Sequence, residues 1–260
     1  MCTQRRRTAG IRIGYEKTQI HIDPGPGALV HSIYAGLTPM QLSGIIVTHC
    51  HPDHYTDAEV LVEAMTGGTA RHHGVLAAAK SVLEGGVDID PSVSKYHQRL
   101  PLNVYSLTPG SKFNTGEFRF KANIAKHTDP DTVGFTADLP DIGKIGYTSD
   151  TEFSDEVAES YKDCRLLILC TMRPKGEPLV GHLCSDDAVK IIDIAKPRFV
   201  VTTHYGIKIL NADPVAEALW IQTQTGTPVV ASTDGMWLKM DKAVTVYGSR
   251  KTDTPRSFDV

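Results

Sequence analysis

The segment His49-Cys50-His51-Pro52-Asp53-His54 holds the densest set of chemically active side chains in the chain. It follows a short apolar run that predicts a strand. In an extended segment, residues two apart face the same way, so His49 and His51 can bind one ion. The proline turns the chain, which lets Asp53 and His54 reach a second ion. Neutral imidazoles with a carboxylate suit zinc or a similar divalent metal, so the segment predicts a metal site.

Two ions need more ligands than this segment holds, and three later polar residues are candidates. His127, Asp150 and His204 each follow an apolar run that predicts a strand. Taken alone, each of them could equally be a capping or core residue. Taken together, at the C-terminal ends of apolar strands, they indicate one site gathered from several strands.

The ordered set His-x-His-x-Asp-His, then His, Asp and His, resembles the metallo-β-lactamase superfamily, and the resemblance covers nearly the whole chain. It implies an α/β fold, a four-layer αββα sandwich with the site along one edge. It also implies two divalent metal ions, with zinc as the default and iron or manganese compatible with the same ligands. By this resemblance the first ion would be held by His49, His51 and His127, the second by Asp53, His54 and His204, and Asp150 would bridge both.

The same resemblance assigns two further residues. Asp23 matches an early strand-end aspartate that usually accepts hydrogen bonds from the metal-ligand loop. The segment Gly181-His182-Leu183-Cys184-Ser185 is similar to one in the nuclease branch, whose histidine contacts the scissile phosphate and can protonate the leaving oxygen. We therefore expect Asp53 and His182 to be the catalytic residues. The alternative for His182 is a structural histidine near a helix cap.

Motifs around the ligands favour phosphodiester substrates. The residues from His127 to Phe135, and the run Tyr147-Thr148-Ser149-Asp150-Thr151, resemble turns of ribonuclease Z-like phosphodiesterases. The Pro-Gly-His-Thr-type turn of glyoxalase II thioesterases is absent from the sequence, and His51 stands where diiron oxygen reductases typically carry glutamate. The interval between His127 and Asp150 is too short for the arm with which ribonuclease Z grips transfer RNA.

We therefore expect a cytoplasmic, binuclear metal-dependent hydrolase of a small or cyclic phosphodiester or of single-stranded nucleic acid. Two alternatives stay open. The same machinery could hydrolyse a β-lactam, a lactone or another acyl bond, or the chain could be a metal-binding scaffold without activity. No membrane partner is expected, and a homodimer is an expectation from the family.

The elements that must position these side chains can be read from the apolar pattern. Strands are predicted at 18–22, 45–48, 118–125, 132–137, 144–148, 166–170, 198–203 and 228–231. Helical patterns occupy Thr56–Met65, Asp186–Ala195 with Ser185 as its cap, and Ala212–Gln222. An Ala-rich stretch after Gly74 is also expected to be helical. Strands interleaved with helices are typical of the α/β class.

Composition sets broader bounds. The 260 residues can form one domain, predicted over 1–250, and the polar residues 251–260 are expected to be a flexible tail. The net charge of −3 gives no general positive field for nucleic acid, and Arg5-Arg6-Arg7 is the one basic cluster of note.

The five cysteines are too scattered for a disulfide framework. No run approaches the roughly 18 to 20 apolar residues that span a bilayer, and residues 1–7 do not resemble a secretory signal.

Overall fold

The structure is a computed structural model that describes residues 5–8, 10–249 and 253–260. Contacts between residues divide the chain into two compact units. The first unit contains Met1–Arg119 and Asp131–Val133, and the second contains Phe120–Pro130 and Gly134–Val260. The expectation of a single domain over residues 1–250 stays a prediction.

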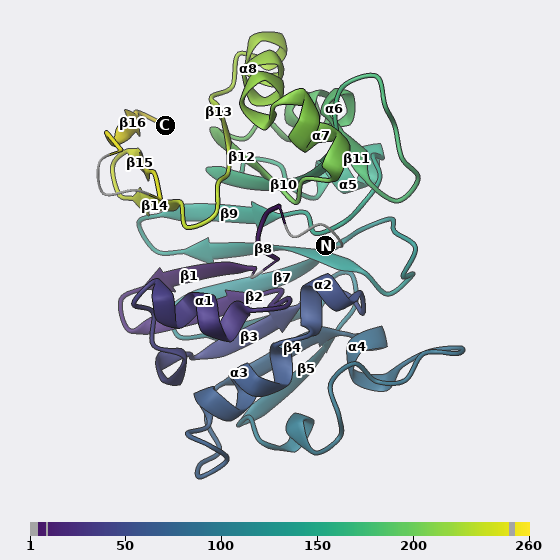
Figure 1. Ribbon diagram of the computed structural model, residues 1–260, viewed down its shortest axis with the longest axis vertical. Helices are drawn as coiled ribbons and strands as arrows, with labels where there is room; N and C mark the ends of the chain where they lie inside the picture. Colours follow the sequence, from purple (N-terminus) through teal and green to yellow (C-terminus); the bar gives the residue numbers. More distant parts are fainter. Residues whose placement is uncertain (1–4, 9, 250–252) are drawn as a thin grey trace. The chain divides into compact units, whose positions relative to one another are not determined.

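The first unit is built on a sheet of strand order β1-β2-β3-β4-β5 (Figure 1). These strands are β1 (Ile11–Tyr15), β2 (Thr18–Ile22), β3 (Gly44–Val47), β4 (Val75–Ala79) and β5 (Asn103–Leu107). The β1 strand is antiparallel to β2, and the remaining neighbours are parallel. Every residue of β3 and β4 is buried, which is typical of interior strands in a parallel sheet.

Short helices accompany this sheet: α1 (Ala28–Tyr34), α2 (Pro52–Tyr55), α3 (Ala58–Met65), α4 (Lys80–Glu84) and the 3-10 turns η1 (Pro39–Gln41) and η2 (His97–Arg99). The α3 helix buries Leu61, Val62 and Met65, and it lies within the helix predicted over Thr56–Met65. The α2 helix begins at Pro52, where the missing proline N–H costs no hydrogen bond.

The Ala-rich stretch after Gly74 is a strand, so the expected helix is wrong there. Residues Val75–Ala79 form β4, between β3 and β5. Alanine favours helices when other forces are weak. In this segment every side chain is buried and both edges of the backbone pair with neighbouring strands, so tertiary packing overrides the local preference. The helix that follows, α4, begins at Lys80.

The second unit is built on a sheet of strand order β13-β12-β10-β9-β8-β7. These strands are β7 (Phe118–Ile124), β8 (Val133–Leu139), β9 (Gly143–Tyr147), β10 (Leu166–Arg173), β12 (Phe199–Thr203) and β13 (Val229–Ala231), with β6 (Lys112–Thr115) preceding β7 in the chain. The run from β9 through β10 and β12 to β13 is parallel, whereas β8 is antiparallel to β9. Each of the strand segments predicted from the sequence overlaps an observed strand of one unit or the other.

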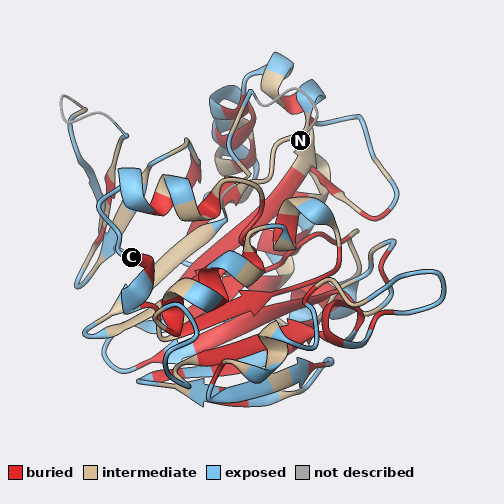
Figure 2. Cartoon of the chain, turned by 60° about the horizontal axis from the view of Figure 1, so that its bottom comes forward, coloured by how far each residue is buried: buried red, intermediate tan, exposed pale blue. Residues whose placement is uncertain are grey.

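The helices of the second unit are α5 (Asp155–Glu159), α6 (Ser185–Ala195), α7 (Ile207–Ala212) and α8 (Pro214–Thr225). Leu167, Leu169 and Val200 of the sheet form one apolar core with Ile192 of α6 and Ile221 of α8. The helices therefore show buried and exposed residues side by side, whereas the sheet strands are mainly buried (Figure 2).

The start of α6 differs by one residue from the prediction. Cys184, not Ser185, is the N-cap, and its thiol lies 3.1 Å from the carboxylate of Asp187. The Asp187 carboxylate also accepts a hydrogen bond from the backbone N–H of Cys184. Ser185 is already inside the helix and fully buried.

The C-terminal residues form a small sheet of β14 (Trp237–Met240), β15 (Val244–Tyr247) and β16 (Arg256–Phe258). The β16 strand falls within the expected tail: it pairs with β15, and the ring of Phe258 lies 4.9 Å from that of Phe199. The flexibility expected of residues 251–260 stays a prediction. Residues 251 and 252 of the tail lie outside the described residues.

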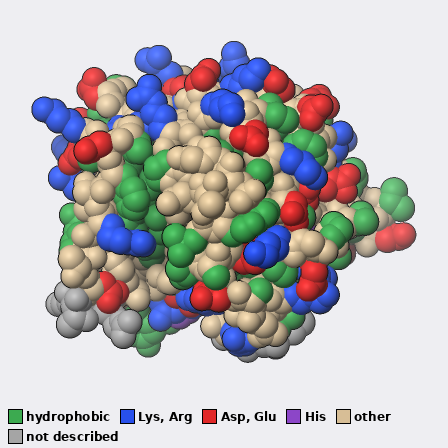
Figure 3. All heavy atoms as spheres, turned by 90° about the horizontal axis from the view of Figure 1, so that it is seen from above, with side chains coloured by type: hydrophobic (Ala, Val, Ile, Leu, Met, Phe, Trp, Pro, Cys, Tyr) green, Lys and Arg blue, Asp and Glu red, His purple; other side chains and the backbone are tan. Residues whose placement is uncertain are grey.

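Among the described residues, no helix combines the length and apolar character that crossing a membrane requires. On the described part of the face drawn in Figure 3, lysines and arginines are interspersed with aspartates and glutamates, so this face presents no continuous basic surface. In the basic cluster, Arg5 and Arg7 are exposed and Arg6 is half-buried.

Candidate metal centre

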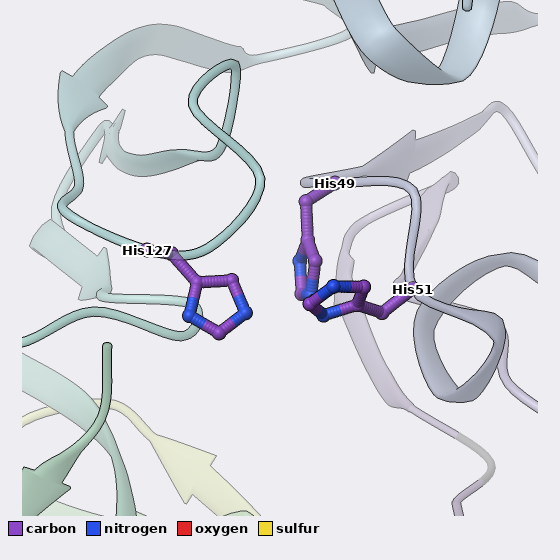
Figure 4. Close-up of side chains that lie close together, drawn as sticks. All are labelled: His49, His51 and His127. Atoms are coloured by element: carbon purple, nitrogen blue, oxygen red, sulfur yellow. The ribbon is translucent and has the colours of Figure 1, made fainter. Parts of the chain in front are cut away.

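In the first unit, the connection from β3 to α2 carries the dense histidine motif. His49 is fully buried and His51 is half-buried, and their imidazoles are drawn in Figure 4. Nε2 of His49 lies 3.1 Å from Nδ1 of His51, and the ring centroids of His49 and His54 are 4.1 Å apart. Nε2 of His54 lies 3.9 Å from a carboxylate oxygen of Asp53. The connection therefore gathers imidazole and carboxylate groups at the carboxyl end of a buried strand.

Asp23 fixes this connection from the end of β2. Its carboxylate accepts hydrogen bonds from the backbone N–H of Thr48 at 2.8 Å and from the Thr48 hydroxyl at 2.7 Å. The same carboxylate lies 2.9 Å from Nδ1 of His54, in a pair that is almost fully buried. When Nδ1 of His54 donates to this carboxylate, Nε2 is the nitrogen that could bind a metal ion.

The chain around Asp23 is closely packed against the motif. The φ angle of Asp23 is 49°, a left-handed conformation that is uncommon for residues other than glycine. Two residues later, a Cβ atom on Gly25 would collide with the carbonyl oxygens of Asp53 and Thr8. Gly25 is therefore required for the backbone of this loop to approach that of Asp53.

In the second unit, His127 lies on the loop after β7, where Figure 4 draws its imidazole. Its Nδ1 lies 2.7 Å from the carbonyl oxygen of Gly181, which can only accept a hydrogen bond. The proton therefore sits on Nδ1, and Nε2 is the basic nitrogen available to a metal. Gly181 has a φ angle of 75°, and a Cβ atom there would lie 3.1 Å from Nδ1 of His127.

Asp150 stands among three histidines of the second unit. Its carboxylate oxygens lie 3.4 Å from Nε2 of His204, 3.6 Å from Nδ1 of His182 and 3.9 Å from Nε2 of His127. Asp150 is 2% exposed, and the side chains of His182 and His204 are each 18% exposed. His127, Asp150 and His182 offer ligand atoms close enough together to hold one metal ion.

These groups come from the carboxyl ends of parallel strands. Asp150 follows β9 and His204 follows β12, which is where side chains of neighbouring parallel strands converge. Ser149 and His204 have φ angles of 56° and 59°, so both turns hold strained backbone at the site. The hydroxyl of Tyr205 bonds the carbonyl of Thr202 and accepts the N–H of Ser232, which fixes the turn at His204.

The donor chemistry of both units fits divalent metal ions. Each unit offers imidazole nitrogens and carboxylate oxygens, the ligands that zinc and similar ions take in proteins. In His54 and His127, a protein acceptor already faces Nδ1, as is usual for metal-binding histidines.

The sequence analysis did not identify two residues that contact the predicted site. Thr48 directs both its N–H and its hydroxyl to Asp23, and a carboxylate oxygen of Glu152 accepts the N–H of Gly181 at 3.1 Å. Thr48 could have been suspected, because it ends the strand next to the histidine motif. No local signal identifies Glu152, because its partner is 29 residues away in the chain.

The comparisons with known proteins identify the family of the chain. Residues 18–205 match the family of the β-lactamase superfamily domain. The chain is 39% identical over 240 residues to an uncharacterized protein of Methanocaldococcus jannaschii, MJ1374, covering 92% of this chain and 89% of that one. It is 21% identical to ribonuclease Z of Thermoplasma volcanium, covering 82% of this chain and 86% of the relative.

A solved structure shows the same fold. The metallo-β-lactamase fold protein YhfI of Bacillus subtilis matches with a TM-score of 0.73 at 17% identity, over 89% of this chain and 90% of that one. The α/β class and the fold predicted from the motif set are thereby confirmed.

Proposed function

Because the chain belongs to the β-lactamase superfamily and has the metallo-β-lactamase fold, we propose that it is a binuclear metal-dependent hydrolase of phosphodiester bonds. The observation that carries the proposal is the cluster around Asp150, where a buried carboxylate stands within 3.9 Å of three imidazoles.

The proposed ligands are His49, His51 and His127 for one ion, Asp53, His54 and His204 for the other, and Asp150 for both. Zinc is the expected metal, and iron or manganese would accept the same donors. Bound divalent ions would lower the pKa of water and stabilise negative charge that develops on the substrate oxygens. Asp23 and the Gly181 carbonyl orient His54 and His127, so that Nε2 of each ring faces away from its protein partner.

His182 is proposed as the general acid. Its Nδ1 lies 3.6 Å from Asp150, and its ring stands edge-on to that of His127 with 4.8 Å between centroids. An imidazole in this place could give its proton to the leaving oxygen of a substrate. His182 also lies just before α6, whose N-terminal end favours a phosphate.

Phosphodiesters are proposed over acyl substrates because the Gly181-His182 segment is similar to that of the nuclease branch, whose histidine contacts the scissile phosphate. The relative named ribonuclease Z supports the same class, since such an enzyme would cleave a phosphodiester. The hairpin of β8 and β9 occupies the interval between His127 and Asp150, so no long arm for transfer RNA lies there. A small or cyclic phosphodiester, or a short single strand, is the proposed substrate.

Steady-state kinetics on bis-p-nitrophenyl phosphate and nitrocefin test this proposal. We expect kcat/KM for the phosphodiester to exceed that for the β-lactam with the same metal-loaded preparation. The matched control is the His182→Ala variant, which should lose turnover selectively on a phosphodiester with a poor leaving group, such as a phenyl ester. If nitrocefin or a lactone is hydrolysed far better than any phosphodiester, the protein is an acyl hydrolase and the proposed role of His182 fails with it.

A further inference from the structure

Both backbone polar groups of Gly181 contact side chains of the second unit. Its carbonyl oxygen lies 2.7 Å from Nδ1 of His127, and its N–H donates to Oε2 of Glu152 at 3.1 Å. His127 and Glu152 belong to different loops, after β7 and after β9. The two peptide planes that flank the Cα atom of Gly181, directly before His182, are therefore each oriented by a group far away in the sequence.

The two loops that supply these groups are themselves joined. The N–H of Glu152 donates to the carbonyl of Lys126 at 2.8 Å, and the N–H of Lys126 donates to the hydroxyl of Thr151 at 2.9 Å. Glu152 is therefore fixed at its backbone next to His127 and reaches Gly181 with its side chain. Because its backbone is fixed, the carboxylate of Glu152 has little freedom to reach another hydrogen-bond donor.

We propose that Glu152 is a positioning residue, which holds the backbone at Gly181 so that His182 faces Asp150. This inference rests on the proposed role of His182 as the general acid. Without the Glu152 contact the Val180–Gly181 peptide can rotate, and the turn that leads into His182 loses one of its two backbone contacts, so the imidazole of His182 is displaced.

The backbone conformation of Gly181 leaves little room for change around its hydrogen bond with Glu152. Its φ angle of 75° is costly for other residues, and a Cβ atom would lie 3.1 Å from Nδ1 of His127. The backbone at Gly181 thus has one conformation that satisfies both partners at once. Val180, the preceding residue, is 81% exposed, so packing of that side chain gives the loop little support.

The test compares Glu152→Ala and Glu152→Gln with the wild-type protein, all metal-loaded. The glutamine variant keeps an oxygen that can accept the Gly181 N–H, whereas the alanine variant has none. The matched control is Glu156→Ala, which removes an exposed carboxylate four residues along the same segment. Metal content should stay the same in all four proteins, since Glu152 is not among the proposed ligands.

The first readout does not depend on turnover. Hydrogen exchange at the backbone amides of Gly181 to Leu183 should become faster in Glu152→Ala by about tenfold, which is the loss of roughly one hydrogen bond. Glu152→Gln and the control should exchange at the wild-type rate. An unchanged exchange rate in Glu152→Ala would show that the hydrogen bond between Glu152 and the Gly181 N–H does not hold this segment, whether or not the protein hydrolyses any phosphodiester.

The second readout separates positioning of an acid from general damage. On a series of aryl phosphodiesters, a misplaced acid matters most when the leaving group is poor. We expect Glu152→Ala to lower kcat by about 10- to 100-fold on phenyl esters, with little change on p-nitrophenyl esters or in KM. Glu152→Gln should recover the loss. A fall that is the same for every leaving group, or that Glu152→Gln shares, would overturn the positioning role.

Discussion

Oδ2 of Asp23 lies 2.9 Å from Nδ1 of His54, with both side chains almost completely buried. The other oxygen of the same carboxylate accepts the N–H of Thr48 at 2.8 Å. One side chain thus ties the end of β2 to the end of β3 and to a proposed metal ligand.

Asp23→Ala should therefore weaken both folding and metal binding. The substitution leaves the buried donors of Thr48 and His54 without their acceptor, at a cost of about 1–3 kcal/mol each. It also removes the group that orients His54, for which a 10- to 100-fold loss of metal affinity is typical. Urea unfolding and metal titration measure the two effects, with Asp90→Asn at an exposed position as the control. Wild-type metal affinity in Asp23→Ala would contradict the orienting role.

Metal content tests the proposed ligand sets. Chelator-free wild-type protein should contain about two metal equivalents per chain, as a binuclear site requires. His204→Ala removes a ligand of one proposed ion and should retain close to one equivalent, whereas His72→Ala, at an exposed position, should retain both. A wild-type protein that saturates at one equivalent would refute the binuclear assignment.

His182→Ala distinguishes a general acid from a ligand. Because His182 is proposed to donate a proton and not to bind metal, the variant should keep its metal and lose phosphodiester turnover by about 10²–10⁴-fold. Elemental analysis and kcat on the same sample check both statements. The group of His127, Asp150 and His182 could hold an ion by itself, so a joint loss of metal and activity would make His182 a ligand.

Cys184 provides a prediction about stability. Its thiol and backbone N–H both meet the carboxylate of Asp187 at the start of α6, and burial raises the pKa of this thiol to about 11. Cys184→Ala should lower the free energy of unfolding by about 0.5–2 kcal/mol, the usual cost of a lost N-cap. Cys184→Ser keeps a donor for Asp187 and should lose less. Equal losses in urea unfolding would show that the thiol contributes by packing alone.

Glu59 predicts a pH dependence of stability in the first unit. Burial raises the pKa of Glu59, but hydrogen bonds from Ser94 and the nearby His97 lower it by more, so the pKa lies below its ordinary value of 4.5. A lowered pKa means that this carboxylate stabilises the fold above pH 4.5 and that its contribution is lost as the pH falls further.

Melting temperatures of wild type and Glu59→Gln between about pH 6 and about pH 3 measure this effect. The wild type should be the more stable at the higher pH, and the difference should shrink toward the lower end. A difference that does not vary with pH would assign the effect to packing instead of charge.

The strands and the predicted site residues were accessible from the sequence because both are local signals. The strand of Phe199–Thr203 is an apolar run of β-branched residues, and His204 follows it directly. Predicting that Asp150, His182 and His127 converge required the resemblance as well, since no periodicity relates them. The contacts of the second unit now place these three together.

The incorrect predictions of secondary structure lie where tertiary packing, and not the local sequence, determines the conformation. Val75–Ala79 has the composition of a helix, and only its place between two strands makes it β4. The helix expected over Ala212–Gln222 is broken at Asp213, which caps α8 with its side chain and has a φ angle of 72°. The strand at Arg256–Phe258 depends on pairing with β15 and on the ring of Phe199, neither of which a local pattern reveals.

A left-handed backbone conformation occurs at Asp23, Ser149 and His204. Substitutions that raise thermal stability at such positions can remove side chains that are proposed to support activity. At each of these positions glycine would relieve strain of about 1 kcal/mol or more. Ser149→Gly should therefore be tolerated or even raise the melting temperature. Variants enriched for heat resistance alone would tend to replace His204 as well, and would discard a proposed ligand in doing so. Thermostable variants of this protein should therefore be selected for metal content and turnover together with heat resistance.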